Sequence, residues 1–241
     1  MPFERYPLAE VIEDRAHPMA RGIWPATLAP VEQLLNDGLP LGPATVFVGE
    51  NGSGKSTLVE AVAIAFGLSA EGGSNNPREQ ARESESLLHD HLLLRRHAGT
   101  SRRGYFLRAE TMHGFFTYLE QNPRTSGRPE PRFHELSHGE SFLALVSDRF
   151  IYPGLYVLDE PESALSLSGC VALASALREL VERGDSQVIM ATHSPVLAAL
   201  PGAEIYEVGE WGLRPRYWDE LALVRSWKAF LDEPQKFLDA Q

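Results

Sequence analysis

Short apolar runs alternate along the chain with longer segments that carry an apolar stripe and a polar face. The runs Ala44–Glu50, Leu155–Leu158 and Gln187–Thr192 are mostly apolar, which is typical of strands buried on both faces of a sheet. Helical composition marks Ser56–Phe66 and Leu167–Arg183. Strands that alternate with helices predict an α/β fold with a mostly parallel sheet flanked by helices.

Weaker patterns complete the predicted order of elements. Leu92–Leu94 and Tyr105–Leu107 are expected to be short strands joined across an Arg/Gly-rich turn, and Glu204–Val208 with Leu213–Tyr217 a hairpin. Further helices are predicted over Met112–Gln121 and from about Ser137 to about Phe150. We expect a single domain over residues 1–241, in which residues 111–150 form a small inserted helical lobe.

Composition is that of a soluble globular protein, with 43% hydrophobic and 23% charged residues. No apolar run is long enough for a membrane helix, and the N-terminus lacks the apolar core of a secretory signal. The single cysteine, Cys170, excludes an internal disulfide and is expected to be a small buried hydrophobe. These features predict a cytoplasmic protein that does not insert into a membrane.

The formal net charge of −11 argues against a chain built as a whole to wrap nucleic acid. Arginines nevertheless outnumber acidic residues between residues 78 and 132. The simpler interpretation is a solvated face with ion pairs. The alternative is a local binding surface for phosphates that includes Arg95, Arg96, Arg102 and Arg103.

Residues 49–56 match the phosphate-binding pattern G-x-x-x-x-G-K-[ST] at every defined position. Glycines let backbone N–H groups turn toward an anion, and the following helix adds the positive end of its dipole. Lys55 is expected to reach the β- and γ-phosphates and to assist catalysis, and the Ser56 hydroxyl to bind Mg²⁺. The predicted nucleotide contacts are Gly49, Glu50, Asn51, Gly52, Ser53, Gly54, Lys55, Ser56 and Thr57.

Two carboxylates follow the apolar strand Leu155–Leu158. Asp159 would lie at the carboxyl edge of the sheet, where it can hold Mg²⁺ or its water. Glu160 would accept a proton from an attacking water. Apolar strands often end in acids, so this pattern gains its specificity from the phosphate loop that precedes it.

Residues 136–140, Leu-Ser-His-Gly-Glu, resemble the LSGGQ signature of ABC-type ATPases. In that family the signature meets the γ-phosphate held by an opposite subunit, so the resemblance assigns nucleotide contacts to Ser137, His138, Gly139 and Glu140. His138 replaces Gly and Glu140 replaces Gln. A helix cap in which Ser137 and Glu140 bond reciprocally is the structural alternative, and both roles are compatible.

Further segments match the same family in the correct order. His193, in Ala-Thr-His-Ser-Pro, resembles the switch histidine that contacts the γ-phosphate. Ser166 stands where the family's D-loop commonly has Asp, and Glu110 would replace the usual Q-loop glutamine as a metal or water contact. For the adenine ring, Trp24 and Tyr6 are candidate stacking partners, with core packing the preferred interpretation of each.

The resemblance therefore implies a P-loop NTPase fold (RecA-like) with a helical lobe carrying the signature. It also implies the cofactors ATP and Mg²⁺ and an ATP-sandwiched, head-to-tail homodimer. The run from the signature through Asp159-Glu160-Pro161 is most similar to compact bacterial AAA-family ATPases related to the SMC/RecF branch. Too few residues separate Glu110 from Ser137 for a coiled-coil arm.

The leading hypothesis for function is a soluble ATP-hydrolysing switch in nucleic-acid maintenance or defence, with DNA or RNA as a further partner. The alternative is the nucleotide-binding subunit of a membrane transporter, with a permease as partner. A third is a module that traps ATP with negligible turnover, against which Glu160 and His193 argue. Nothing in a small-molecule kinase requires the signature helix, and the base-reading N-K-x-D of GTPases is absent.

Overall fold

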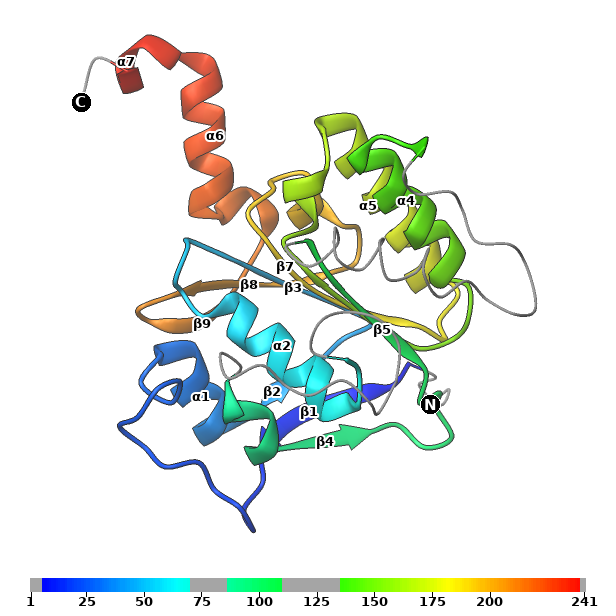
Figure 1. Cartoon of the computed structure of the whole chain (residues 1–241). Helices are drawn as coiled ribbons and strands as arrows, with labels where there is room; N and C mark the ends of the chain where they lie inside the picture. The colour runs from blue at the N-terminus through cyan, green and yellow to red at the C-terminus, as the bar shows by residue number, and fades with distance from the viewer. Residues whose placement is uncertain (1–5, 70–85, 110–134, 239–241) are drawn as a thin grey trace.

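The computed structural model describes residues 6–69, 86–109 and 135–238, which form two sheets and flanking helices (Figure 1). The strands are β1 (Leu8–Glu13), β2 (Leu39–Pro40), β3 (Ala44–Gly49), β4 (Leu92–Arg96), β5 (Gly104–Arg108), β6 (Leu155–Asp159), β7 (Gln187–Thr192), β8 (Glu204–Gly209) and β9 (Gly212–Arg216). The α-helices are α1 (Ala29–Asp37), α2 (Lys55–Phe66), α4 (His138–Arg149), α5 (Leu167–Glu182), α6 (Ala222–Asp232) and α7 (Pro234–Leu238).

The larger sheet has six strands in the order β5-β6-β7-β3-β8-β9. The first five are parallel, and β9 pairs antiparallel with β8 in the predicted hairpin. The central strands β3, β6 and β7 are almost entirely buried, as their continuous apolar runs predict. The predicted α/β fold with a mostly parallel sheet is thus confirmed.

Each face of this sheet buries its own hydrophobic core. On one face, α1 and α2 pack with the second sheet around side chains such as Phe47, Leu58 and Phe106. On the other, α4 and α5 cover Val46, Leu158 and Met190. Cys170 lies in this second core and is 5% exposed, which confirms its expected role as a small buried hydrophobe.

The second sheet has the order β2-β1-β4 and is antiparallel. Strands β4 and β5 were both expected, but they do not pair with each other, because β4 joins β1 while β5 joins β6. The buried side chain of Gln187 connects the two sheets. Its amide nitrogen donates to the carbonyls of Leu8 and Gly42, and its amide oxygen accepts from the Leu8 N–H, each at 2.8 Å.

The phosphate-loop helix α2, the signature helix α4 and the long helix α5 all begin within one residue of their predicted starts. The predicted helix Met112–Gln121, and with it most of the predicted helical lobe, lies outside the described residues. Helices α6 and α7 and strand β1 had no sequence prediction. None of the helices in the described part of the chain is both long and apolar enough to span a membrane.

Candidate functional site

The loop between β3 and α2 is a tight backbone cradle. A Cβ on Gly49 would lie 2.3 Å from the carbonyl oxygen of Val208, so only glycine fits between the neighbouring strands. Gly54 caps α2 with φ +99°, a left-handed conformation that favours glycine. The sequence thus produces a loop that directs the first N–H groups of α2 at one point, which is a ready anion site.

Lys55 is folded onto this loop. Its Nζ donates to the Glu50 carbonyl at 2.9 Å, and the residue is only 2% exposed. Burial lowers the pKa of Lys55, while the nearby carboxylates of Glu160, Asp159 and Glu162 oppose that shift. A phosphate arriving in the cradle would offer this ammonium an anionic partner in place of a backbone carbonyl.

Asp159 ends β6 directly beside the loop and is 5% exposed. Its carboxylate accepts a hydrogen bond from the Ser56 side chain, and its Oδ1 has no protein partner. Burial raises the pKa of Asp159 from 3.8 to about 6, against the opposing effects of Ser56 and Arg108. The structure therefore brings together two of the three residues expected to hold Mg²⁺, and the third, Glu110, lies outside the described residues.

These side chains fit Mg²⁺ well. The ion prefers oxygen ligands and usually keeps several waters while binding one or two protein groups together with phosphate oxygens. The Ser56 hydroxyl and the orphaned Asp159 Oδ1 supply such oxygens. Among the described residues, no three His, Cys, Asp or Glu side chains form a dedicated metal cluster. A metal bound jointly by protein and nucleotide matches this donor set.

A basic side chain lies at the same place, and the sequence reasoning did not assign it. Arg108 at the end of β5 is in register with Asp159 on β6. Its Nη1 lies 2.7 Å from a carboxylate oxygen of Glu60 on α2, and its Nε lies 3.6 Å from Asp159 Oδ2. Glu60 is 7% exposed, so Arg108 provides charge compensation for two buried carboxylates.

Glu160 and His193 face each other at the ends of β6 and β7. The His193 Nε2 lies 3.1 Å from Glu160 Oε1, so the imidazole donates to the carboxylate. Glu160 adopts a left-handed backbone with φ +48°, held by its N–H bond to the Ala191 carbonyl. Glu162 accepts from the His193 N–H. Such a constrained backbone at a candidate base is common at functional sites.

A cavity of about 190 Å³ lies between the phosphate loop and Glu160. It is lined by Trp24, Leu28, Gly52, Gly54, Lys55, Ser56, Thr57 and Glu160. Trp24 is 56% exposed, so the expectation that it packs in the core is wrong. Its ring instead borders the candidate phosphate cavity. Tyr6 is partly buried and contacts the ring of His97 edge-on, with the centroids 4.6 Å apart.

The signature segment forms the start of α4. Ser137 and Glu140 make the predicted capping box: the Ser137 N–H donates to Glu140 Oε2 at 2.9 Å, and the Glu140 N–H donates to Ser137 Oγ at 3.4 Å. Gly139 lies against the turn that follows Glu160, because an added Cβ would be 3.3 Å from the Ala164 carbonyl. Of the described residues that line the phosphate cavity, none belongs to this segment. The capping function is confirmed, and the nucleotide contacts remain a prediction.

The arginines of the 78–132 region are partly engaged within the chain. Arg95 pairs with Glu10 at 2.5 Å, and Arg96 lies 4.5 Å above the Phe66 ring. Arg103 lies 4.9 Å above the Tyr152 ring. Of the other arginines, Arg102 is exposed and Arg108 contacts Glu60 as described above, while those at 78, 82, 124, 128 and 132, together with Glu110, lie outside the described residues. The described arginines therefore agree better with a solvated face than with an open phosphate surface.

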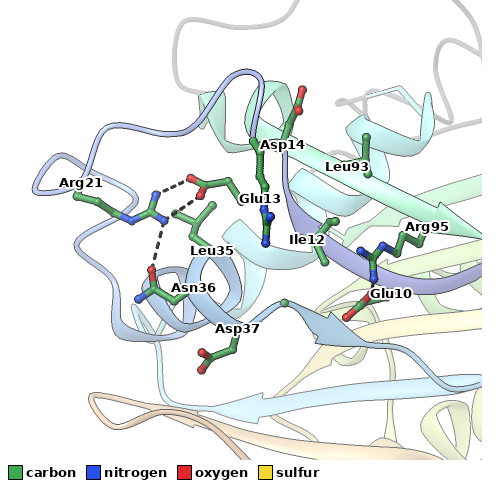
Figure 2. A pocket seen from close by; sticks show the side chains of 12 residues that line it. Glu10, Ile12, Glu13, Asp14, Arg21, Leu35, Asn36, Asp37, Leu93 and Arg95 are labelled. Atoms are coloured by element: carbon green, nitrogen blue, oxygen red, sulfur yellow. Dashed lines mark hydrogen bonds and ion pairs between the residues drawn. The ribbon is translucent and has the colours of Figure 1, made fainter.

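A larger cavity of about 700 Å³ lies on the outer side of the second sheet, against α1 (Figure 2). Several of its charged side chains bind one another: Arg21 bonds to Glu13 and Asn36, and Arg95 bonds to Glu10. The lining carries four acidic and three basic side chains, so little net charge is left to attract a ligand. The smaller cavity beside the phosphate loop is therefore the candidate active site.

The part of the chain that forms the candidate site matches two known families. Residues 76–199, more than half of the chain, match the family described as "AAA domain, putative AbiEii toxin, Type IV TA system". Residues 40–111 match a family described as "AAA domain". The first of these matches contains the candidate carboxylates, the signature segment and His193.

Curated relatives are ATP-binding proteins. The zinc import ATP-binding protein ZnuC of Vibrio vulnificus (strain YJ016) is 29% identical over 159 residues, which cover 63% of this chain and 58% of the relative. The aliphatic sulfonates import ATP-binding protein SsuB 2 of Streptomyces avermitilis is 32% identical over 158 residues, covering 64% and 61%. The chain thus spans about three fifths of the length of these relatives.

Solved structures share the fold at low sequence identity. One chain comes from a structure described as "An inward-facing conformation of a putative metal-chelate type ABC transporter". It has a TM-score of 0.50 and 17% identity, covering 94% of this chain and 89% of that one. The SMC head domain from Thermotoga maritima has a TM-score of 0.42 and 18% identity, covering 75% and 93%. The first likeness supports the P-loop ATPase fold.

Proposed function

The chain belongs to the AAA family described as "AAA domain, putative AbiEii toxin, Type IV TA system", and we propose that it is an ABC-type ATPase that binds MgATP at the phosphate loop and hydrolyses it. The observation that supports this proposal is the convergence of Lys55, Ser56 and Glu160 on one cavity. ATP-binding relatives agree with the nucleotide.

Each side chain has a role that its geometry permits. The loop N–H groups and Lys55 would hold the β- and γ-phosphates, while Ser56 and Asp159 would hold Mg²⁺, which neutralises charge on the phosphates. Glu160 would take the proton of the attacking water, because it borders the cavity and is held by the His193 imidazole. His193 would then orient Glu160 and contact the γ-phosphate.

We further propose that hydrolysis occurs between two copies arranged head to tail. The signature segment borders the turn after Glu160 and does not line the chain's own phosphate cavity, as a contact made to a second copy requires. Ser137 and the N-terminus of α4 would present a hydroxyl and backbone N–H groups to the opposite γ-phosphate. Two bound ATP molecules would then join the copies.

The solution mass of the Glu160→Gln variant, with and without MgATP, tests both proposals. Loss of the base should halt the reaction after binding, so an ATP-dependent increase in mass is expected to accumulate. A variant that binds ATP yet stays monomeric would refute the sandwich. Wild-type protein that binds ATP but releases no phosphate, alone or as a dimer, would refute the proposed hydrolysis.

The biological role that we propose is a switch in nucleic-acid maintenance or defence. The family description names a toxin, which supports defence. Charge reversal at Arg102 and Arg103 should abolish any stimulation of the ATPase by DNA, and unchanged stimulation would refute a role for that surface. A transporter subunit is the second candidate, favoured by the import proteins among the relatives, and it predicts that the chain co-purifies with a permease.

A further inference from the structure

The C-terminal arm, residues 218–238, begins at the edge of the larger sheet and projects from the body of the molecule (Figure 1). Its root is firmly attached. Leu221 and Val224 are buried, and the Ala222 N–H donates to Glu207 Oε1 at 2.8 Å. The Trp218 indole N–H donates to the Pro195 carbonyl, also at 2.8 Å. The arm is therefore fixed to the loop that follows His193.

Beyond its root the arm exposes a set of large apolar side chains. Their exposed fractions are 47% for Trp227, 36% for Phe230, 69% for Leu231, 44% for Phe237 and 61% for Leu238. The first three stand at helical spacings i, i+3 and i+4, which places them on one face of α6. The rings of Phe230 and Phe237 meet edge-on with centroids 5.8 Å apart, so α7 continues the same apolar face.

The size of this face exceeds what scattered surface residues produce. From the exposed fractions and the 150–250 Å² that an aromatic side chain can bury, the five side chains expose on the order of 500 Å². That area is near the upper range for the largest apolar patch on a monomer, and such patches usually serve binding. Two such faces together would bury about 1,000 Å², the lower limit for a specific protein–protein interface.

We propose that the apolar face of the arm pairs with the same face of a second copy of this chain, in a two-fold symmetric contact that does not require nucleotide. A two-fold contact uses the same residues on both copies, so it covers the five side chains twice without a further component. This inference goes beyond the proposed ATPase and does not depend on it. Paired arms would hold two ATPase bodies at high effective concentration for any contact made between the bodies.

The mass of the full chain at micromolar concentration, with EDTA and no nucleotide, tests the pairing. Wild-type protein is expected to be a dimer and Leu231→Glu a monomer. Because Leu231 enters a symmetric interface twice, we expect the dimer dissociation constant to rise about 100-fold or more. The matched control is Ala229→Glu, which places the same charge on the opposite, exposed side of α6 and should stay dimeric. Circular dichroism and ATP binding verify that both variants are folded.

A monomeric wild type would overturn the pairing and leave the face to a different protein. Equal loss of the dimer in both Glu variants would also overturn it, because the contact would not depend on the apolar face. The Glu160→Gln change on the Leu231→Glu background separates this test from the ATPase proposal. ATP-dependent association that survives there, in protein that is monomeric without ATP, supports both proposals. Its absence refutes the sandwich alone, provided the protein concentration is raised toward the roughly millimolar effective concentration that paired arms would supply.

Discussion

Replacing Asp159 with Asn should stabilise the nucleotide-free protein at neutral pH while removing its affinity for magnesium. Burial raises the pKa of Asp159 from 3.8 to about 6, so the fold favours the protonated carboxyl. A folded-state pKa above the unfolded value means that the group stabilises the fold at low pH. This contribution is lost as the pH rises through about 6. At neutral pH the fold thus holds a carboxylate at a net cost.

The size of this cost follows from the pKa. The difference between 3.8 and about 6 corresponds to about 3 kcal/mol of unfolding free energy. An asparagine amide is uncharged at every pH, so Asp159→Asn should recover up to about 3 kcal/mol at neutral pH. The loss of the ion pair with Arg108 offsets part of this gain. At a pH near 3.8, the ordinary pKa of the carboxyl, this gain in unfolding free energy should vanish.

Urea unfolding of wild type and of Asp159→Asn in EDTA, at neutral and at acidic pH, measures the unfolding free energy of each protein. The reasoning is refuted if Asp159→Asn is no more stable than wild type at neutral pH, or if the difference between them does not depend on pH. Asp37→Asn is the matched control, because Asp37 is exposed and its change should stay within about 0.5 kcal/mol. Magnesium-dependent ATP binding, measured in parallel, should be lost only in the Asp159 variant.

Three further substitutions test the site. Gly49→Ala should abolish ATP binding and lower the melting temperature, because its Cβ would lie 2.3 Å from a β8 carbonyl; calorimetry that shows normal binding would contradict this. Trp24→Ala should weaken ATP binding about tenfold, equivalent to about 1.4 kcal/mol, through loss of base stacking. Binding of GTP and of inorganic triphosphate to the same variant reports whether the ring contacts the base. Arg108→Gln should destabilise the fold by about 3 kcal/mol, because it removes the guanidinium that lies beside the buried carboxylates of Glu60 and Asp159. Mg²⁺ without nucleotide should raise the melting temperature of this variant but not that of wild type.

The parts of the fold that the sequence predicted are those with a strong local pattern. Strand β7 has the predicted bounds Gln187–Thr192, because a run of six buried residues between polar neighbours has few other interpretations. Strand β1 was missed, since only two of its six residues are fully buried and its partners are distant in sequence. Helix α6 was missed as well, because it begins without a side-chain cap.

The residues of the candidate site likewise differ in whether a local sequence pattern predicts them. Lys55, Ser56, Asp159 and His193 belong to local motifs whose spacing predicts their chemistry. Arg108 belongs to no motif. Its position beside Asp159 results from the register of β5 on β6, which a single sequence does not reveal. A basic residue two positions before the expected Q-loop contact was the available signal.

The three bonds of Gln187 make the N-terminal strand and the central sheet a single cooperative unit. Opening β1 would break the two bonds between Gln187 and Leu8, which contribute about 0.5–1.5 kcal/mol each. The Leu8 amide should therefore exchange its hydrogen with solvent as slowly as the amides of β7, although it lies near the beginning of the chain. In Gln187→Ala, the amides of β1 should exchange faster than those of β7, and the two sheets should unfold in separate steps.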